Sequence, residues 1–226
     1  KKNNCSSQMR MASSTDAPNI ATTGNPIPTP PPADVPDVQI AGTNVLVTGP
    51  LKSFSGTTSR TGTSPVVRIT DSTVTQLGTD NLVQTAPGAA VSLNGSLLEG
   101  ARSTITSGGS LLRLSSTLSG PGPLLDVTET TLTVAGAVVN LSGGSTLTVT
   151  SGPAIRVSGG SLTADALGIG DGTGNTFHFN GTVLDLSNNA TVSLRTLGES
   201  VPDNDTDTAT FNLGLNEPFV RMSNST

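Results

Sequence analysis

The chain has 226 residues, of which 62 are Ser or Thr, 26 are Gly and 15 are Pro, and its formal net charge is −5. Ser, Thr, Gly and Pro are poor residues for the interior of a helix, so the composition argues against a helical protein. The acidic balance argues against nucleic-acid binding, which needs clustered Lys and Arg, and a single cysteine, Cys5, cannot form an internal disulfide.

Residues 1–36 contain few apolar side chains and end in a proline-dense stretch over 25–32. Proline fixes φ and removes a backbone donor, so this segment is predicted to be an extended, polyproline-like arm. Residues 37–226 form the second predicted unit.

From about residue 37 a short motif recurs: two apolar residues, a variable residue, another apolar residue and a small polar one. Its eight copies begin at Val66, Ala90, Leu111, Leu124, Val138, Ala154, Val183 and Phe219. Most copies are followed by a second burst such as Thr131-Leu132-Thr133. Alternation with period two and many β-branched residues predict strands.

Regularly repeated short strands separated by turn residues are typical of a β-solenoid, in which stacked coils share one core. A β-sandwich is the alternative, but it usually carries Trp or Tyr in its core, and this chain has neither. The sequence therefore predicts an all-β, right-handed parallel β-helix with an extended N-terminal arm.

Residues 138–149 and 154–163 resemble coils of the right-handed parallel β-helix of bacterial surface proteins, such as autotransporter passengers and haemagglutinin-type adhesins. The resemblance covers roughly residues 65–200 and implies an exported, extended protein at the cell surface. The motif is degenerate and marks an architecture.

Alternation along the motif places its variable residue on the outside of the coil. The expected outer ladder contains Arg68, Ser92, Arg113, Asp126, Asn140, Arg156, Asp185 and Arg221, with no like charges in consecutive copies. We expect a structural ladder, with a ligand site as the alternative. The first motif position is apolar throughout, so these residues either turn inward at a corner or form an outer stripe that a strand or another subunit covers.

The last motif copy begins just before the end of the sequence, which predicts an incomplete coil with open strand edges. We expect a second copy to pair with these edges by stacking or strand exchange, building a fibre. The expected assembly residues are Val38, Ile40, Val45, Val47, Phe219, Val220 and Met222. The alternative is that the chain is cut from something longer.

Three carboxylates, Asp203, Asp205 and Asp207, alternate along one segment. Such oxygens could bind calcium, although a solvated acidic loop is the other interpretation. No catalytic residue is expected. One His and one Cys, far apart in the sequence, make a zinc site implausible.

The function predicted from these features is a structural, self-assembling subunit of an extracellular or cell-surface filament. It is expected to need no cofactor, with calcium as the alternative. No membrane span or nucleic-acid partner is expected. A fragment of a surface adhesin that binds glycans is one alternative, and a carbohydrate-active β-helix enzyme using Asp126 and Asp185 is another. Ice binding is suggested by the Thr-x-Thr bursts, but their irregular spacing argues against a regular threonine face.

Overall fold

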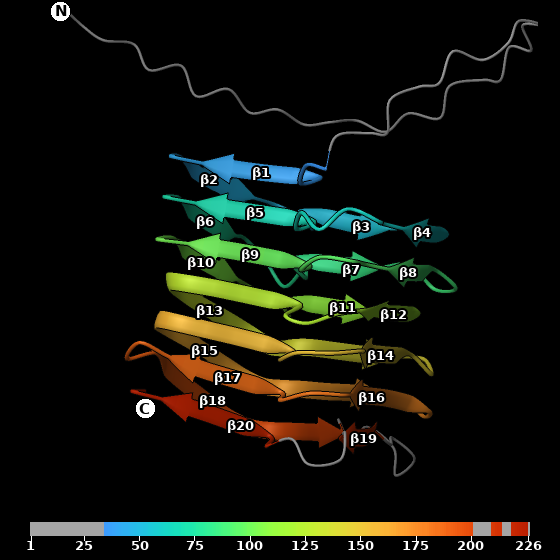
Figure 1. Cartoon of the computed structure of the whole chain (residues 1–226). Helices are drawn as coiled ribbons and strands as arrows, with labels where there is room; N and C mark the ends of the chain where they lie inside the picture. Colours follow the sequence, from blue (N-terminus) through green and yellow to red (C-terminus); the bar gives the residue numbers. More distant parts are fainter. Residues whose placement is uncertain (1–33, 201–208, 214–217, 226) are drawn as a thin grey trace, which may run out of the picture.

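The computed structural model describes residues 34–200, 209–213 and 218–225. These residues are all-β and contain no helix, and every paired strand lies parallel to its neighbours in a β-solenoid (Figure 1). The predicted fold class is thereby confirmed. Most of the predicted N-terminal arm, residues 1–33, lies outside the described part of the chain.

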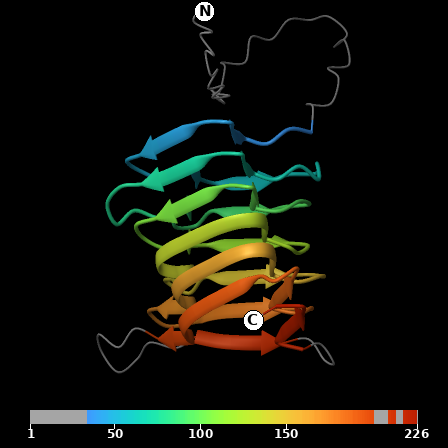
Figure 2. The same ribbon diagram turned by 90° about the vertical axis from the view of Figure 1, so that its left-hand side faces the viewer.

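Each coil contains four strand positions, and the equivalent positions of successive coils stack into four columns (Figures 1 and 2). The first column holds β1 (Val38–Ala41), β5 (Val67–Thr70), β9 (Leu98–Ala101), the starts of β13 (Leu125–Ser142) and β15 (Ile155–Asp171), β17 (Leu184–Ser187) and β20 (Val220–Ser223). The second column holds β2 (Asn44–Val47), β6 (Thr73–Gln76), β10 (Thr104–Ser107), the middles of β13 and β15, and the start of β18 (Thr191–Ser200).

The other two columns complete the circuit. The third holds β3 (Lys52–Phe54), β7 (Val83–Thr85), β11 (Leu112–Leu114) and the ends of β13, β15 and β18. The fourth holds β4 (Thr57–Ser59), β8 (Ala90–Ser92), β12 (Thr117–Gly120), β14 (Thr146–Val149), β16 (Asn175–Phe179) and β19 (Ala209–Leu213).

The length of a coil explains the uneven spacing of the sequence motif. First-column strands begin at residues 38, 67, 98, 125, 155, 184 and 220, so one coil spans 27–36 residues. The motif copies are divided among columns: those beginning at Leu111 and Val138 lie in the third column, the copy at Ala90 lies in the fourth, and the others lie in the first. The closest copies are therefore half a coil apart.

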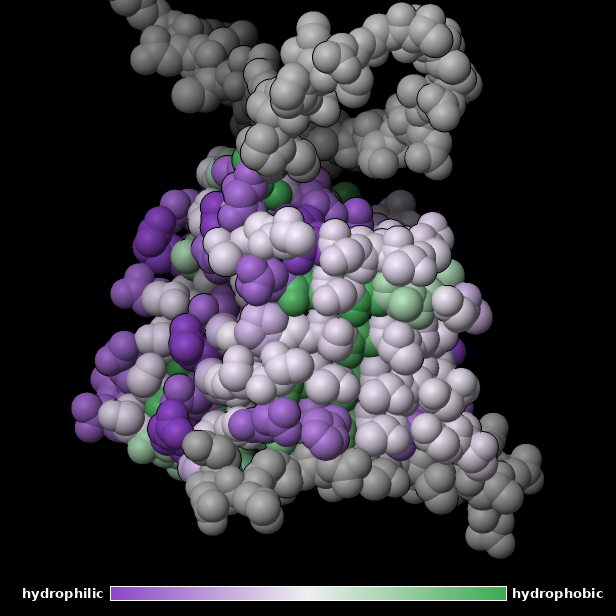
Figure 3. Space-filling view, turned by 45° about the vertical axis from the view of Figure 1, so that its right-hand side comes forward, coloured by the Kyte–Doolittle hydropathy of each residue, from purple (hydrophilic) through white to green (hydrophobic). Residues whose placement is uncertain are grey.

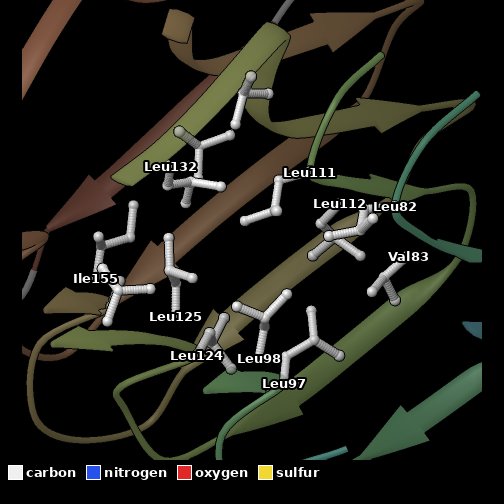
Figure 4. Packing of buried hydrophobic residues seen from close by; sticks show 14 of the residues in the cluster. Leu82, Val83, Leu97, Leu98, Leu111, Leu112, Leu124, Leu125, Leu132 and Ile155 are labelled. Atoms are coloured by element: carbon white, nitrogen blue, oxygen red, sulfur yellow. The ribbon is translucent and has the colours of Figure 1, made fainter. Parts of the chain in front are cut away.

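The apolar residue at the first motif position points into the bore at a corner. At Leu97 and Leu98, both backbone amides donate to the carbonyl of Leu124, at 2.8 and 3.0 Å, and Leu124 and Leu125 share the carbonyl of Ala154 in the same way. This doubling breaks the strict alternation, so two consecutive side chains face inward (Figure 4). The outer apolar stripe is absent from these corners, and only Ala90 and Phe219 among the eight first positions are partly exposed.

The corner between the first and second columns has its own ladder. Asp71, Arg102, Glu129 and Asn188 all adopt positive φ, between 48° and 56°, and turn the chain there. In three of these coils the next residue carries a hydroxyl group and is buried: Ser72, Ser103 and Thr130. The amide of Ser103 donates to Thr130 Oγ1 at 3.4 Å. In this way the buried backbone at the corner keeps its hydrogen bonds.

Gly160 lies beside Thr130 in the next coil and combines positive φ with close packing. A Cβ there would lie 2.3 Å from the Thr130 carbonyl oxygen at φ +78°, whereas Gly88, at φ +75°, has nothing within 4 Å. Gly88→Ala is expected to cost about 1–2 kcal/mol of unfolding free energy from the backbone conformation alone. Gly160→Ala is expected to cost clearly more, as measured by denaturant unfolding, because the clash adds to the same backbone penalty. Equal losses would contradict this packing.

Candidate functional site: outer faces and ends of the solenoid

A ladder of charged residues follows the outside of the first column. Its members in register are Gln39, Arg68, Glu99, Asp126, Arg156, Asp185 and Arg221. The predicted ladder residues Asp126, Arg156, Asp185 and Arg221 are therefore neighbours in register. Arg113 and Asn140 instead pair with each other in the third column, because their motif copies occupy that column.

Glu99 was missed by the motif because Gly100 stands where the other copies have an apolar residue. Although consecutive copies of the motif carry no like charges, the ladder does bring two together, since Glu99 and Asp126 are register neighbours. Each carboxylate has an arginine on its other side: Arg68 Nε lies 3.2 Å from Glu99 Oε1, and Arg156 Nη1 lies 3.2 Å from Asp126 Oδ2. The ladder thus contains two successive ion pairs, Arg68 with Glu99 and Asp126 with Arg156, whose two carboxylates are the adjacent members.

The carboxyl of Asp126 has a perturbed pKa in this setting. Burial raises the pKa of Asp126 above its ordinary value, Arg156 opposes that shift, and the nearby negative charge of Glu99 adds to it. The charged form of Asp126 is therefore disfavoured by its surroundings, although it has an arginine partner.

The third column carries a weaker polar ladder. Arg113 Nη2 lies 3.8 Å from Asp171 Oδ2. Asn140, between Arg113 and Ile169 in register, has a buried side-chain oxygen, Oδ1, with no hydrogen-bond partner among the described residues. The distance between the charged groups is therefore longer in this column than in the first, and one polar atom has no partner among the described residues.

The outside of the second column is a regular array of hydroxyl side chains, which we call the threonine face. Its first rank is Thr73, Thr104, Thr131, Ser161 and Thr191, and its second rank is Thr75, Thr106, Thr133, Thr163 and Ser193. The prediction that irregular spacing prevents a regular threonine face was wrong, because the extra residues are accommodated at corners and in the other columns.

The fourth column is a less regular counterpart of the threonine face. Its outward pairs include Thr146 with Thr148 and, in the next coil, Thr176 with His178. His178 lies on the face opposite Phe177 and Phe179, whose rings are buried and stacked at a centroid distance of 6.1 Å.

The predicted assembly residues lie at the two ends of the described stack. In the first coil, Ile40 is buried and Val38, Val45 and Val47 are partly buried against the core. In the last first-column strand, Val220 and Met222 are 37% and 52% exposed, and Phe219 is partly buried. Within the described part of the chain, β1 and β20 each pair with a strand on one side only.

The structure does not bring the remaining predicted site residues together. Asp203, Asp205, Asp207 and Cys5 lie outside the described residues, in which no group of three or more potential metal-ligating side chains occurs. Asp126 and Asp185 lie two coils apart, with Arg156 between them. A small cavity inside the bore is lined by apolar side chains, including Leu124, Ile155 and Phe177, beside Gly168.

The fold and outer faces define the protein as a parallel β-solenoid. Comparisons with protein-family models, with curated proteins and with solved structures find no match to the chain. No helix in the described ranges is long and apolar enough to cross a membrane.

The charged ladder predicts opposite pH responses for two carboxylates. The pKa of Asp126 is raised, so its stabilising contribution is present below its ordinary pKa and is lost as the pH rises through the raised value. The hydrogen bond from Arg195 lowers the pKa of Asp165, so that contribution is present above the ordinary pKa and lost as the pH falls through the lowered value. Carboxyl NMR titration of the two residues tests this difference.

In the same titration, Glu99→Gln is expected to lower the pKa of Asp126, and Arg156→Gln is expected to raise it. Neither variant should shift Asp165, which lies in a separate ion pair with Arg195. A pKa of Asp126 below its ordinary value in the unmodified chain would contradict the ladder geometry.

Proposed function

We propose that this protein is a structural subunit of an extracellular or cell-surface filament, formed by head-to-tail stacking of β-solenoids. The observation that carries the proposal is the match between the strands at the two ends of the described stack. Both β1, with the sequence Val-Gln-Ile-Ala, and β20, with Val-Arg-Met-Ser, have apolar residues at their first and third positions with a polar residue between them, and both belong to the same column.

The two ends can continue the register that already operates within the molecule. Placing β20 of one copy against β1 of the next sets Val220 beside Val38 and Met222 beside Ile40. Arg221 then lies beside the uncharged Gln39. Stacking would cover apolar surface that is exposed at Val220 and Met222 and would satisfy open strand edges, which otherwise invite pairing with another chain.

The sides of the solenoid offer less to a partner of this kind. They carry the ion pairs of the first column, the hydroxyls of the second and fourth, and separate exposed leucines such as Leu46 and Leu77. Figure 3 shows a face on which near-neutral residues cover a large area, with hydrophilic residues beside them and a narrow line of hydrophobic residues between them. A head-to-tail contact uses two different surfaces and does not close on itself, so repetition gives a fibre. The resemblance to β-helical bacterial surface proteins supports a location outside the cell.

Assembly is tested with a charge placed at the end of the stack. Met222→Asp is expected to abolish fibres seen by negative-stain electron microscopy, because it puts a carboxylate against the apolar core of the next copy. Leu77→Asp is the matched control, since Leu77 is 45% exposed and lies on the side of the second coil. The control is expected to form normal fibres.

Circular dichroism of both variants should show unchanged β content, since both residues are already exposed. Isolated short rods from the unmodified chain would overturn the filament proposal and favour an adhesin fragment. Fibres of normal length from Met222→Asp would also overturn end-to-end stacking through β20.

A further inference from the structure

We propose that the threonine face binds the surface of ice. The face consists of two ranks of hydroxyl side chains that run along the stack, one pair from each of five successive coils. In the first coil, Asn44 and Leu46 occupy the equivalent positions, so the hydroxyl array begins at the second coil. It lies on the side of the solenoid, so this inference does not rest on the assembly of its ends.

The geometry of the array follows from strand pairing. Neighbouring parallel strands lie about 4.8 Å apart, and alternate residues of one strand lie about 6.6 Å apart. The threonine face therefore repeats in two nearly perpendicular directions. The shorter repeat is close to the spacing of oxygen atoms along one direction of a prism plane of hexagonal ice, and the longer repeat is slightly shorter than the spacing along the other. An isolated Thr-x-Thr segment has only one of these repeats, whereas five stacked coils have both.

The array rests on a rigid floor. Val74, Ile105, Leu132 and Leu162 lie between the paired hydroxyl residues of their strands, and each is completely buried. The strand pairing is also regular throughout the array, and the register shift between β13 and β15 falls beyond it, between Val134 and Ala137. The hydroxyls are thus held at fixed spacing before any ligand arrives, which reduces the entropy cost of binding.

The hydroxyls of the threonine face are available for a ligand. Within the described part of the chain, none of the ten makes a side-chain hydrogen bond to another protein group. The hydroxyls at the adjacent corner behave differently: Ser72 Oγ donates to the Thr70 carbonyl at 2.7 Å, and Ser103 Oγ donates to the Ala101 carbonyl at 2.8 Å. The corner hydroxyls stabilise the fold, and those of the face point to solvent.

The chemistry of the face favours an uncharged, ordered lattice of water. None of its ten residues carries a charge, although the first column shows that this fold accommodates charged ladders. The nearest ion pairs, Asp71 with Arg102 and Asp165 with Arg195, lie beside the ranks and not in them. A crystalline polysaccharide would be expected to use aromatic platforms, and the chain contains no Trp or Tyr.

Each threonine supplies two complementary groups. The hydroxyl can donate and accept a hydrogen bond at a lattice position, while the methyl group favours an ordered cage of water over mobile solvent at the contact. Many weak contacts at matching spacing then act together on one crystal plane, as in multivalent binding.

The full chain is tested by nanolitre osmometry for thermal hysteresis and faceting of a single ice crystal, with its labelled Cys5 reporting adsorption to ice. Thr106→Lys, in the middle of the second rank, is expected to lose both activities because the longer cation disrupts the flat array. Thr148→Lys is the matched control, a half-buried threonine in the same kind of segment on the fourth column, and is expected to retain both.

Two conservative variants separate the groups involved: Thr106→Val keeps the shape and methyl groups, and Thr106→Ser keeps the hydroxyl. Partial loss of hysteresis in both would support the contribution of both groups. Unfaceted crystals and no adsorption with the unmodified, folded chain would overturn the inference. Equal losses in Thr106→Lys and Thr148→Lys, with β content unchanged, would also overturn it, because activity would not depend on the threonine face.

Discussion

The structure depends on hydrogen bonding between the backbones of successive coils. Within a coil the chain forms no helix in the described ranges, so its strand amides and carbonyls find partners mainly in the coils above and below. Buried backbone groups must be paired, and this requirement holds neighbouring coils in register even where their lengths differ. Register then places equivalent side chains on top of one another, which creates the apolar ladders inside and the charged and hydroxyl ladders outside.

The sequence was sufficient to predict the class of fold, but it did not reveal how many residues make up one coil. Period-two alternation and repeated apolar pairs are local features, and they predict stacked strands without a structure. The length of a coil is not local, because copies of the same motif lie in three of the four columns. Leu111 and Leu124 look equivalent in the sequence, yet the copy at Leu111 lies in the third column and the copy at Leu124 lies in the first.

The outer ladder was predicted in part for the same reason. Asp126, Arg156 and Asp185 could be aligned because their motif copies are intact, whereas Glu99 is followed by Gly100 in place of an apolar residue. A Cβ at Gly100 would lie 3.2 Å from Val127 Cγ1 and 3.3 Å from Ile105 Cδ1. The small residue is thus accounted for by crowding inside the bore, which depends on the neighbouring coil and has no local signature in the sequence.

The faces and ends of the solenoid differ in how much they depend on a single residue. The side surfaces are built from many equivalent contributions, and the threonine face continues over five coils. The ends depend on a few side chains, such as Val38 and Met222, whose strands pair with a neighbouring coil on one side only among the described residues. An interaction at an end can therefore be abolished at one position, whereas an interaction along a side is weakened in proportion to the area disturbed.

The direction of the hydrogen bonds also has a mechanical consequence. Bonds between coils run nearly parallel to the long axis, and the strands of all four columns share the contact between two adjacent coils. Tension along the axis is therefore divided among many bonds loaded at the same time. A force that pulls one strand sideways loads those hydrogen bonds one after another, so they break in sequence. The solenoid should thus resist stretching along its axis much better than peeling from an edge.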